Sequence, residues 1–379
     1  MARKIIIIVS IALLFVFTVG IFAFTGFASV EIIKLVKPED IYIPKNMKSS
    51  NFGLFFYNPD GTRVSTTKNN VPFDPTKPVV IFSHGLSLGF GIETPEEFVN
   101  YEGWLNAGYN VGVFMWSQIS DDDPYICEKK VWGGVDNRFA YNDENMKRTI
   151  ETEDVTNYSM AEIFVAYYID FMSKQNFTGR EIHFEGLSLG AQLTMANCSY
   201  LLALNEAGLI GKEFLPDRVT LFDAFFTNRS YENIRVPWLK RSIGKDGTVA
   251  LALETAKQLK KKGIAMEYIA SSIVNITTAI GEGDKGNILR LYDETAFLDY
   301  SSDWYSIFEQ DKKHIIGRRW YNGMIDYPIP MDDAISGQFA ISPKVPTSYI
   351  FARMGEKYDM AENLTFDPTD DIYFSTGII

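Results

Sequence analysis

One short segment restricts the possible folds of this chain more than any other. Glu181 to Glu185 has the composition of a strand, and it runs directly into Gly186-Leu187-Ser188-Leu189-Gly190 and then into an apolar helix that extends to Leu204. The glycines allow a sharp turn that lifts the hydroxyl of Ser188 above a sheet. At a helix N-terminus, free backbone N–H groups and the helix dipole favour developing negative charge. The segment predicts a strand–turn–helix unit presenting a nucleophilic serine, with a structural glycine-rich turn as the alternative.

Strand and helix patterns alternate along the rest of the chain. Continuous apolar runs such as Pro78–Ser83 and Asn110–Trp116 are typical of strands buried on both faces. Other predicted strands are Asn51–Tyr57, Arg218–Phe222 and Ile264–Ala270, and helices are predicted for Thr94–Gly108, for the segment after Ser159 and for Thr248–Lys262. Strands separated by helices predict an α/β fold with a mostly parallel sheet and helices on both faces. We expect one catalytic domain over residues 51–379, in which the polar insertion 117–156 is either a lid or a solvated loop.

A serine nucleophile needs a base, and the chain has three histidines. His183 precedes Ser188 by five residues on the same strand, roughly 16 Å away, so it is expected in the core. His84 directly follows the strand Pro78–Ser83. Elimination leaves His314 as the predicted base, against the alternative of a surface histidine among lysines.

The third member of a triad orients the imidazole and should follow a strand, between Ser188 and His314 in sequence. Asp223 directly follows the strand Arg218–Phe222. Asp284, in a glycine-rich loop after the next strand, is the alternative. We favour Asp223 because it lies at the end of its strand.

Five segments together resemble the pancreatic-lipase-like family of serine lipases and esterases, which have the α/β-hydrolase fold. They are FDPTKPVVIFSHGL (Phe73–Leu86), VFMW (Val113–Trp116), IHFEGLSLGAQ (Ile182–Gln192), RVTLFDA (Arg218–Ala224) and HIIGRRWYNGMI (His314–Ile325). The resemblance covers about residues 50–330 and includes the order Ser, Asp, His. It implies catalytic Ser188, Asp223 and His314, and an oxyanion hole formed by the backbone N–H groups of Leu86 and Leu189.

The same resemblance suggests where an acyl chain would bind. Apolar side chains in loops that should flank the pocket are Leu86, Leu88, Phe90, Val236, Pro237, Trp238 and Leu239. Three features depart from the family: Asp223 is followed by Ala224-Phe225 rather than Pro-Ala, the family's several disulfides are missing, and too few residues follow His314 for a separate lipid-binding β-sandwich. A colipase-like partner is therefore not implied.

The N-terminus suggests export from the cytosol. After Arg3 and Lys4, the apolar run from Ile5 to Val30 would span roughly 39 Å as a helix, more than the roughly 30 Å of bilayer hydrocarbon. This length favours an uncleaved signal anchor in residues 1–30, with a cleaved signal peptide as the alternative. Residues 31–50 are read as a linker, and the chain is expected to be a type II membrane protein facing the lumen or outside, or to be secreted. Glycosylation sequons begin at Asn157, Asn176, Asn197, Asn228, Asn275 and Asn363.

Composition narrows the remaining function classes. The net charge of −12 argues against a nucleic-acid binder, since phosphate contacts need clustered Lys and Arg. Two cysteines, Cys127 and Cys198, cannot build a disulfide scaffold or a four-cysteine zinc site, although they could pair with each other. No cofactor is expected. The sequence predicts a carboxylic-ester hydrolase acting on lipid or other acyl esters, with a catalytically silent surface binding module or a serine peptidase or acyltransferase as alternatives.

Overall fold

The computed structural model describes residues 33–44, 52–87, 100–142, 148–151, 157–273, 285–300, 305–306, 308–329, 341–362 and 372–378. Leu35–Ile379 forms one compact unit. Within the described ranges, no helix is both long and apolar enough to cross a membrane. The predicted anchor or signal segment 1–30 lies outside these ranges, so it stays a prediction.

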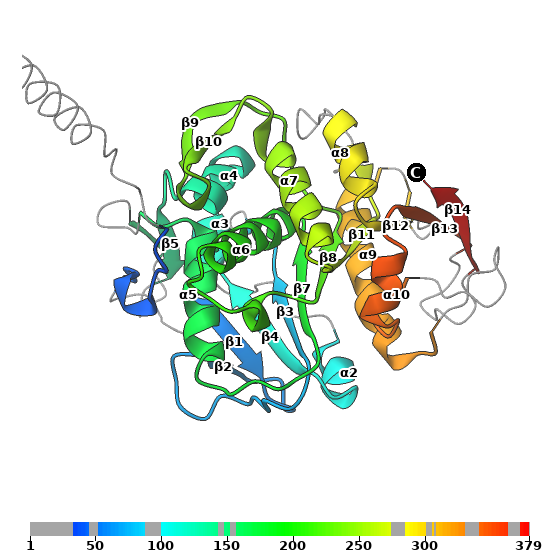
Figure 1. Cartoon of the computed structure of the whole chain (residues 1–379), viewed down its shortest axis with the longest axis horizontal. Helices are drawn as coiled ribbons and strands as arrows, with labels where there is room; N and C mark the ends of the chain where they lie inside the picture. The colour runs from blue at the N-terminus through cyan, green and yellow to red at the C-terminus, as the bar shows by residue number, and fades with distance from the viewer. Residues whose placement is uncertain are drawn as a thin grey trace, which may run out of the picture. The chain divides into compact units, whose positions relative to one another are not determined.

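A ten-stranded sheet runs through the described part of this unit (Figure 1). Its strands, from one edge to the other, are β14 (Ile372–Ile378), β13 (Glu356–Glu362), β12 (Ala296–Asp299), β11 (Ala265–Ala270), β8 (Arg218–Phe222), β7 (Ile182–Leu187), β3 (Val79–Ser83), β4 (Asn110–Met115), β1 (Gly53–Tyr57) and β2 (Arg63–Ser65). Every pair from β13 to β4 is parallel, whereas β14, β1 and β2 join their neighbours antiparallel. The predicted mostly parallel sheet is confirmed.

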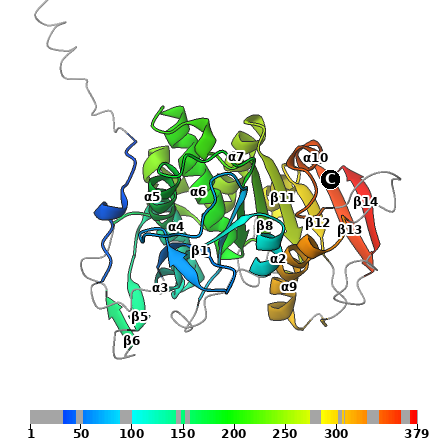
Figure 2. The ribbon, with the colours of Figure 1, turned by 90° about the horizontal axis from the view of Figure 1, so that it is seen from below.

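Burial explains why the central strands read as continuous apolar runs. All residues of β3, β4, β7, β8 and β11 are buried, because helices cover both faces of this part of the sheet. Helices α5, α6 and α7 lie over one face, and α2 and α9 lie over the other (Figure 2). The helices of the described part are α2 (Tyr101–Asn106), α3 (Ser117–Ser120), α4 (Pro124–Gly133), α5 (Met160–Met172), α6 (Leu189–Glu206), α7 (Gly247–Lys261), α8 (Lys285–Tyr292), α9 (Gln310–Gly323) and α10 (Thr347–Ala352).

The start of α5 follows directly from its sequence. Ser159 is the N-cap, its hydroxyl accepts a hydrogen bond from the N–H of Glu162 (3.1 Å), and the Glu162 carboxylate accepts one from the N–H of Ser159 (2.8 Å). This reciprocal capping box satisfies two N–H groups that the helix itself cannot pair. The start of the helix predicted for Thr94–Gly108 lies outside the described residues, and the described helix there, α2, begins at Tyr101.

The first part of the insertion 117–156 forms α3 and α4, and α4 buries Glu128, Val131 and Trp132 completely. The second part contains the hairpin β5 (Phe139–Asn142)–β6 (Arg148–Glu151). A second hairpin is formed by β9 (Tyr231–Val236) and β10 (Arg241–Gly244). A lid role for the insertion stays a prediction, and α4 within it is held by buried contacts.

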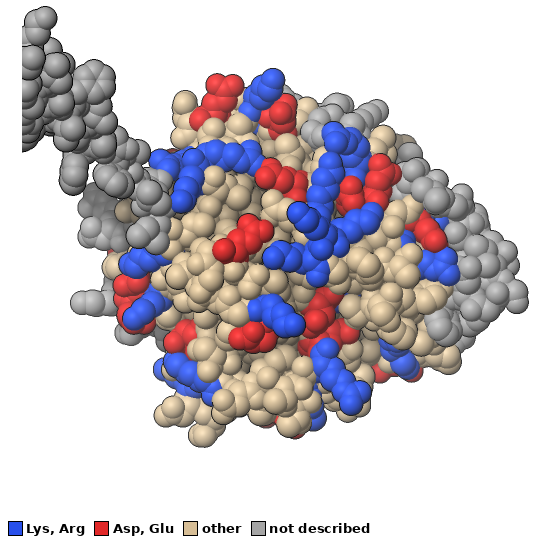
Figure 3. Space-filling model, viewed as in Figure 1, with Lys and Arg blue, Asp and Glu red and all other residues tan. Residues whose placement is uncertain are grey.

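Charged side chains of both signs are interspersed on the face that carries α5, α6 and α7 (Figure 3). Cys127 and Cys198 are free, buried thiols and do not pair with each other. Of the sequon asparagines, Asn157 and Asn176 are exposed, while Asn197, which lies within α6, is 1% exposed. Asn275 and Asn363 lie outside the described residues.

Candidate active site

Ser188 occupies the turn between the central strand β7 and helix α6. Its backbone has φ 56° and ψ −121° as the N-cap of α6, a conformation that costs a non-glycine residue on the order of 1–3 kcal/mol. Two hydrogen bonds hold it there: its N–H donates to the carbonyl of Phe222 (2.9 Å), and its carbonyl accepts from the N–H of Phe225 (3.1 Å). Such a strained elbow at the end of a central parallel strand is a feature of the α/β-hydrolase fold.

Close backbone approach explains the last glycine of the motif. A Cβ on Gly190 would lie 2.1 Å from the carbonyl oxygen of Ser83 and 2.4 Å from that of His84, far inside van der Waals contact. The loop after β3 therefore packs directly on the first turn of α6. A Cβ on Gly85, in the same loop, would lie 3.2 Å from the Cβ of Ser188, so this loop borders the serine side chain.

Asp223 directly follows β8, the strand next to β7, and is completely buried. Its Oδ1 accepts hydrogen bonds from the backbone N–H groups of Ser271 and Ser272, both at 3.1 Å, and its Oδ2 accepts from the hydroxyl of Ser272. The Nδ1 of His314, on α9, lies 2.5 Å from Oδ2. The structure thus brings the predicted acid and the predicted base into direct contact.

This contact determines which ring nitrogen of His314 can act. An ionised carboxylate only accepts hydrogen bonds, so Nδ1 carries the proton and donates. The lone pair of the neutral ring is then on Nε2, the nitrogen that serves as base in a serine triad. The imidazole is 19% exposed, and Ser188 is half-buried. Both groups are therefore accessible to a small molecule.

The two predicted oxyanion donors lie on the segments that meet at Ser188. Leu189 is the first residue of α6, and Leu86 follows Gly85 in the loop after β3. Among the described residues, neither backbone N–H is paired with a backbone carbonyl, whereas the next one, of Ser87, donates to the carbonyl of Ser120 (3.2 Å). Unpaired N–H groups at this place suit a developing oxyanion.

His84 holds the loop that carries Leu86. Its Nε2 accepts a hydrogen bond from the backbone N–H of Trp116 (3.1 Å), which leaves the proton on Nδ1 to donate to the carbonyl of Gly85 (2.9 Å). The indole N–H of Trp116 in turn donates to the carbonyl of His84 (2.9 Å). Both ring nitrogens of this buried histidine are therefore occupied.

His183 lies in the core, as expected from its position in β7. Its Nε2 is 2.7 Å from the hydroxyl of Thr220. Burial and the nearby Arg218 hold the pKa of His183 well below its usual value. His183 is therefore a structural residue of the sheet, and its place five residues before Ser188 on the same strand keeps it out of reach of the serine hydroxyl.

Of the predicted substrate-binding residues Leu88, Phe90 and Trp238, only Trp238 lies within the described ranges. Trp238 is 3% exposed, stacks near Trp132 (ring centroids 6.1 Å apart) and donates its indole N–H to the hydroxyl of Ser199 (2.9 Å). Its role in substrate binding stays a prediction. Leu88, Phe90 and the alternative acid Asp284 lie outside the described residues.

Sequence reasoning missed the residues that hold Asp223. Ser271 and Ser272 follow β11, the strand next to β8, and their position at the same edge of the sheet was the available signal. Among the described residues, no three His, Cys, Asp or Glu side chains are grouped so that they could hold a metal ion.

No family model and no curated protein sequence matches this chain. Solved structures similar to it include the acylaminoacyl peptidase of Pyrococcus horikoshii (12% identity, TM-score 0.35, covering 68% of this chain and 39% of the peptidase). The butyrate-bound esterase Est2 of Thermogutta terrifontis is 11% identical with a TM-score of 0.30, covering 69% of this chain and 81% of the esterase. A structure from work on the metagenome-derived lipolytic enzymes LipS and LipT is 11% identical with a TM-score of 0.26, covering 58% of this chain and 76% of that one. At these TM-scores the similarities add nothing to what the site itself indicates about activity.

Proposed function

We propose that this protein is a serine hydrolase that cleaves carboxylic esters through an acyl-enzyme on Ser188. The observation that supports this most is the bonding of Asp223. Its carboxylate holds Nδ1 of His314, and Phe222, which precedes it, and Phe225, two residues after it, bond the backbone of Ser188. The end of β8 thereby connects the base His314 to the turn that carries Ser188.

In the proposed reaction, Nε2 of His314 removes the proton of Ser188 as its Oγ attacks the ester carbonyl. The N–H groups of Leu86 and Leu189 stabilise the tetrahedral oxyanion, and Asp223 stabilises the imidazolium. His314 then protonates the leaving alcohol, and a water activated by the same nitrogen releases the acid.

Apolar side chains near the N-terminal end of α9 favour a substrate with an acyl chain. Phe308, two residues before α9, is 93% exposed, and Ile273, 36% exposed, donates its N–H to the side chain of Gln310, the first residue of α9 (3.0 Å). His314 lies one turn further along this helix. A lipase-like substrate of the kind expected from the sequence resemblance would find apolar surface there.

Covalent labelling tests the proposed nucleophile. A fluorophosphonate probe should label the wild type and Ser173→Ala, a control at an exposed serine after α5, and should not label Ser188→Ala. Labelling of His314→Ala at the wild-type rate would contradict the proposed base. A correctly folded wild type that is never labelled would favour a silent binding module.

A substrate panel tests the proposed reaction class. We expect turnover of p-nitrophenyl esters and none of peptide substrates. We expect Phe308→Ser to raise KM for long-chain more than for short-chain esters. Faster cleavage of peptides than of esters would overturn the assignment in favour of a peptidase, and preferential transfer to an added alcohol over water would favour an acyltransferase.

Membrane attachment through residues 1–30 is part of the same proposal.

A further inference from the structure

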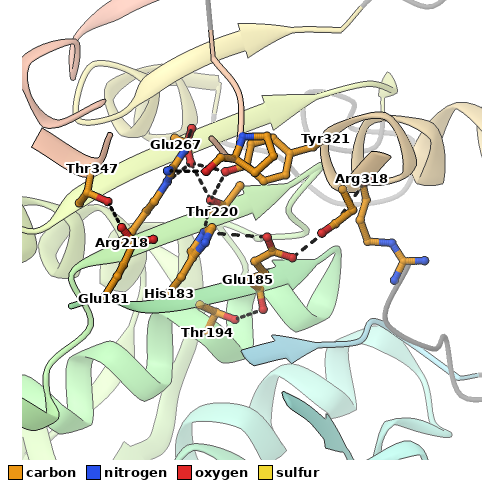
Figure 4. Close-up of polar contacts among 12 residues, drawn as sticks. Glu181, His183, Glu185, Thr194, Arg218, Thr220, Glu267, Arg318, Tyr321 and Thr347 are labelled. Atoms are coloured by element: carbon orange, nitrogen blue, oxygen red, sulfur yellow. Dashed lines mark hydrogen bonds and ion pairs between the residues drawn. The ribbon is translucent and has the colours of Figure 1, made fainter. Parts of the chain in front are cut away.

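A second set of polar contacts lies deeper in the sheet, on the same three elements that carry Asp223, Ser271 and His314. It consists of Arg218 and Thr220 on β8, Glu267 on β11 and Tyr321 on α9, which we name the lower clamp (Figure 4). Arg218 is the first residue of β8, and Asp223 directly follows the last. The upper contacts with Asp223 and the lower clamp therefore join the same strands to the same helix at two levels.

Glu267 is the centre of the lower clamp. Its carboxylate accepts two hydrogen bonds from the guanidinium of Arg218 (2.8 and 2.7 Å), one from the hydroxyl of Thr220 (2.8 Å) and one from the hydroxyl of Tyr321 (2.8 Å). Two elements of the sheet and the helix α9 thus meet on one carboxylate. Figure 4 shows Tyr321 reaching this carboxylate from α9, above the strands.

The clamp is buried, and its charges are paired. Arg218 is 1% exposed and Glu267 is 0% exposed. The donors of Arg218 also bond the backbone carbonyls of Ser342, Pro343 and Val345. In such a low-dielectric setting a bidentate pair has little freedom to rearrange, so Glu267 presents its oxygen to Tyr321 from a fixed position.

Tyr321 and His314 lie on one face of α9. They are seven residues apart, close to two helical turns, so their Cα atoms are roughly 10 Å apart along the helix axis. Between them, Gly317 packs against β11 so closely that a Cβ there would lie 3.0 Å from the side chain of Ser271. The inner face of α9 therefore contacts the sheet from the lower clamp up to Asp223.

We propose that Tyr321 is a positioning residue for the base: its bond to Glu267 sets the rotation and axial position of α9 so that Nδ1 of His314 meets Asp223. The inference rests on the proposed function. Apolar contacts alone let a helix slide or rotate by small amounts, whereas a buried hydrogen bond to a fixed acceptor is directional. Removing the Tyr321 hydroxyl loosens the His314–Asp223 contact without changing any group near Ser188.

Tyr321→Phe tests the inference, with Tyr168→Phe as matched control. The control also removes a buried tyrosine hydroxyl that donates one hydrogen bond, here to the carbonyl of Phe214 (3.2 Å), but from α5 on the other face of the sheet. For Tyr321→Phe we expect kcat for a short-chain ester to fall about tenfold with KM unchanged, and for Tyr168→Phe no change in either constant. Equal loss of kcat in both variants would overturn the positioning role in favour of a general effect on folding.

Histidine NMR provides a readout that does not depend on turnover. The chain has three histidines, and the buried His84 and His183 differ from His314 in exposure. A looser contact weakens the hydrogen bond that Nδ1 donates to Asp223, so we expect Tyr321→Phe, and not Tyr168→Phe, to move the resonance of the Nδ1 proton of His314 upfield. An unchanged resonance would overturn the inference. A shifted resonance in a protein that hydrolyses no ester would instead leave the positioning role intact and refute the proposed function.

Discussion

Asp223→Asn tests the triad most directly, because the substitution keeps the shape of the side chain and changes only one group. The amide oxygen of Asn can still accept the backbone N–H groups of Ser271 and Ser272 that bond Oδ1 at 3.1 Å. The NH2 group then replaces Oδ2, the atom 2.5 Å from Nδ1 of His314. An amide N–H there donates to Nδ1, so the ring carries its proton on Nε2 and cannot remove the proton of Ser188.

The expected loss follows from this change of tautomer. In a serine protease triad the same substitution lowers kcat about 10⁴-fold, which corresponds to about 5 kcal/mol of transition-state free energy. The fold should lose less, about 1–3 kcal/mol, since the bonds of Oδ2 with His314 and with the hydroxyl of Ser272 change while the two backbone bonds to Oδ1 remain. We therefore expect a variant with a cooperative melt within several degrees of wild type and almost no turnover.

The assay is kcat for a p-nitrophenyl ester together with a thermal melt. Asp217→Asn is the matched control, because Asp217 precedes the other end of β8 and accepts the N–H of Ile182 (2.8 Å). It should keep full kcat. A kcat for Asp223→Asn within tenfold of wild type would refute the reasoning, and a large loss in Asp284→Asn alone would assign the acid to Asp284.

Three further predictions concern stability and reactivity. Gly190→Ala should lower the melting temperature by more than 10 °C, or prevent folding, because its Cβ would lie 2.1 Å from the carbonyl of Ser83; an unchanged melt would mean that the loop after β3 yields. Burial raises the pKa of Glu185 to about 8, so the folded state binds its proton more tightly than the unfolded state and loses stability as pH rises from about 4.5 to 8. Glu185→Gln should consequently gain melting temperature relative to wild type as pH rises from 5 to 9, and a difference independent of pH would contradict this account. Burial also raises the pKa of Cys127 to about 12 and that of Cys198 above its usual range, so a thiol reagent at pH 8 should modify both only after denaturation, and rapid labelling of the native protein would refute their inaccessibility.

Much of the central sheet was predictable because most of its strands have a recognisable pattern in their own sequence. Pro78–Ser83 and Asn110–Trp116 are uninterrupted apolar runs, and the structure places β3 and β4 within them. The strands β2, β12, β13 and β14 of this sheet were missed. β12 has four residues, and β13 has the sequence EKYDMAE, which contains no apolar run. Such strands form because a neighbouring strand offers unpaired backbone groups, and that is a tertiary property.

The candidate site was predictable to a similar degree. Ser188, Asp223 and His314 follow from a motif, a strand end and elimination among three histidines. The partners of Asp223 do not, because the bonds from Ser271 and Ser272 depend on how β11 pairs with β8. No pattern along the chain states which strands will be neighbours.

The pairing of β8 with β11 and with β7 explains why a layer of buried polar side chains lies beneath this site. In the parallel pairs, His183 lies opposite Arg218, and both Glu185 and Glu267 lie opposite Thr220. Side chains two residues apart in a strand share a face, so these polar groups gather on one side of the sheet. Tyr321 and Asn322 of α9 bond two of them, the carboxylates of Glu267 (2.8 Å) and Glu185 (3.4 Å). On the opposite side, Phe184 packs against the rings of Phe164 and Tyr168 of α5. The helix that carries the base is thus held to the polar side of the sheet by directional bonds, whereas α5 packs on the opposite side through aromatic rings.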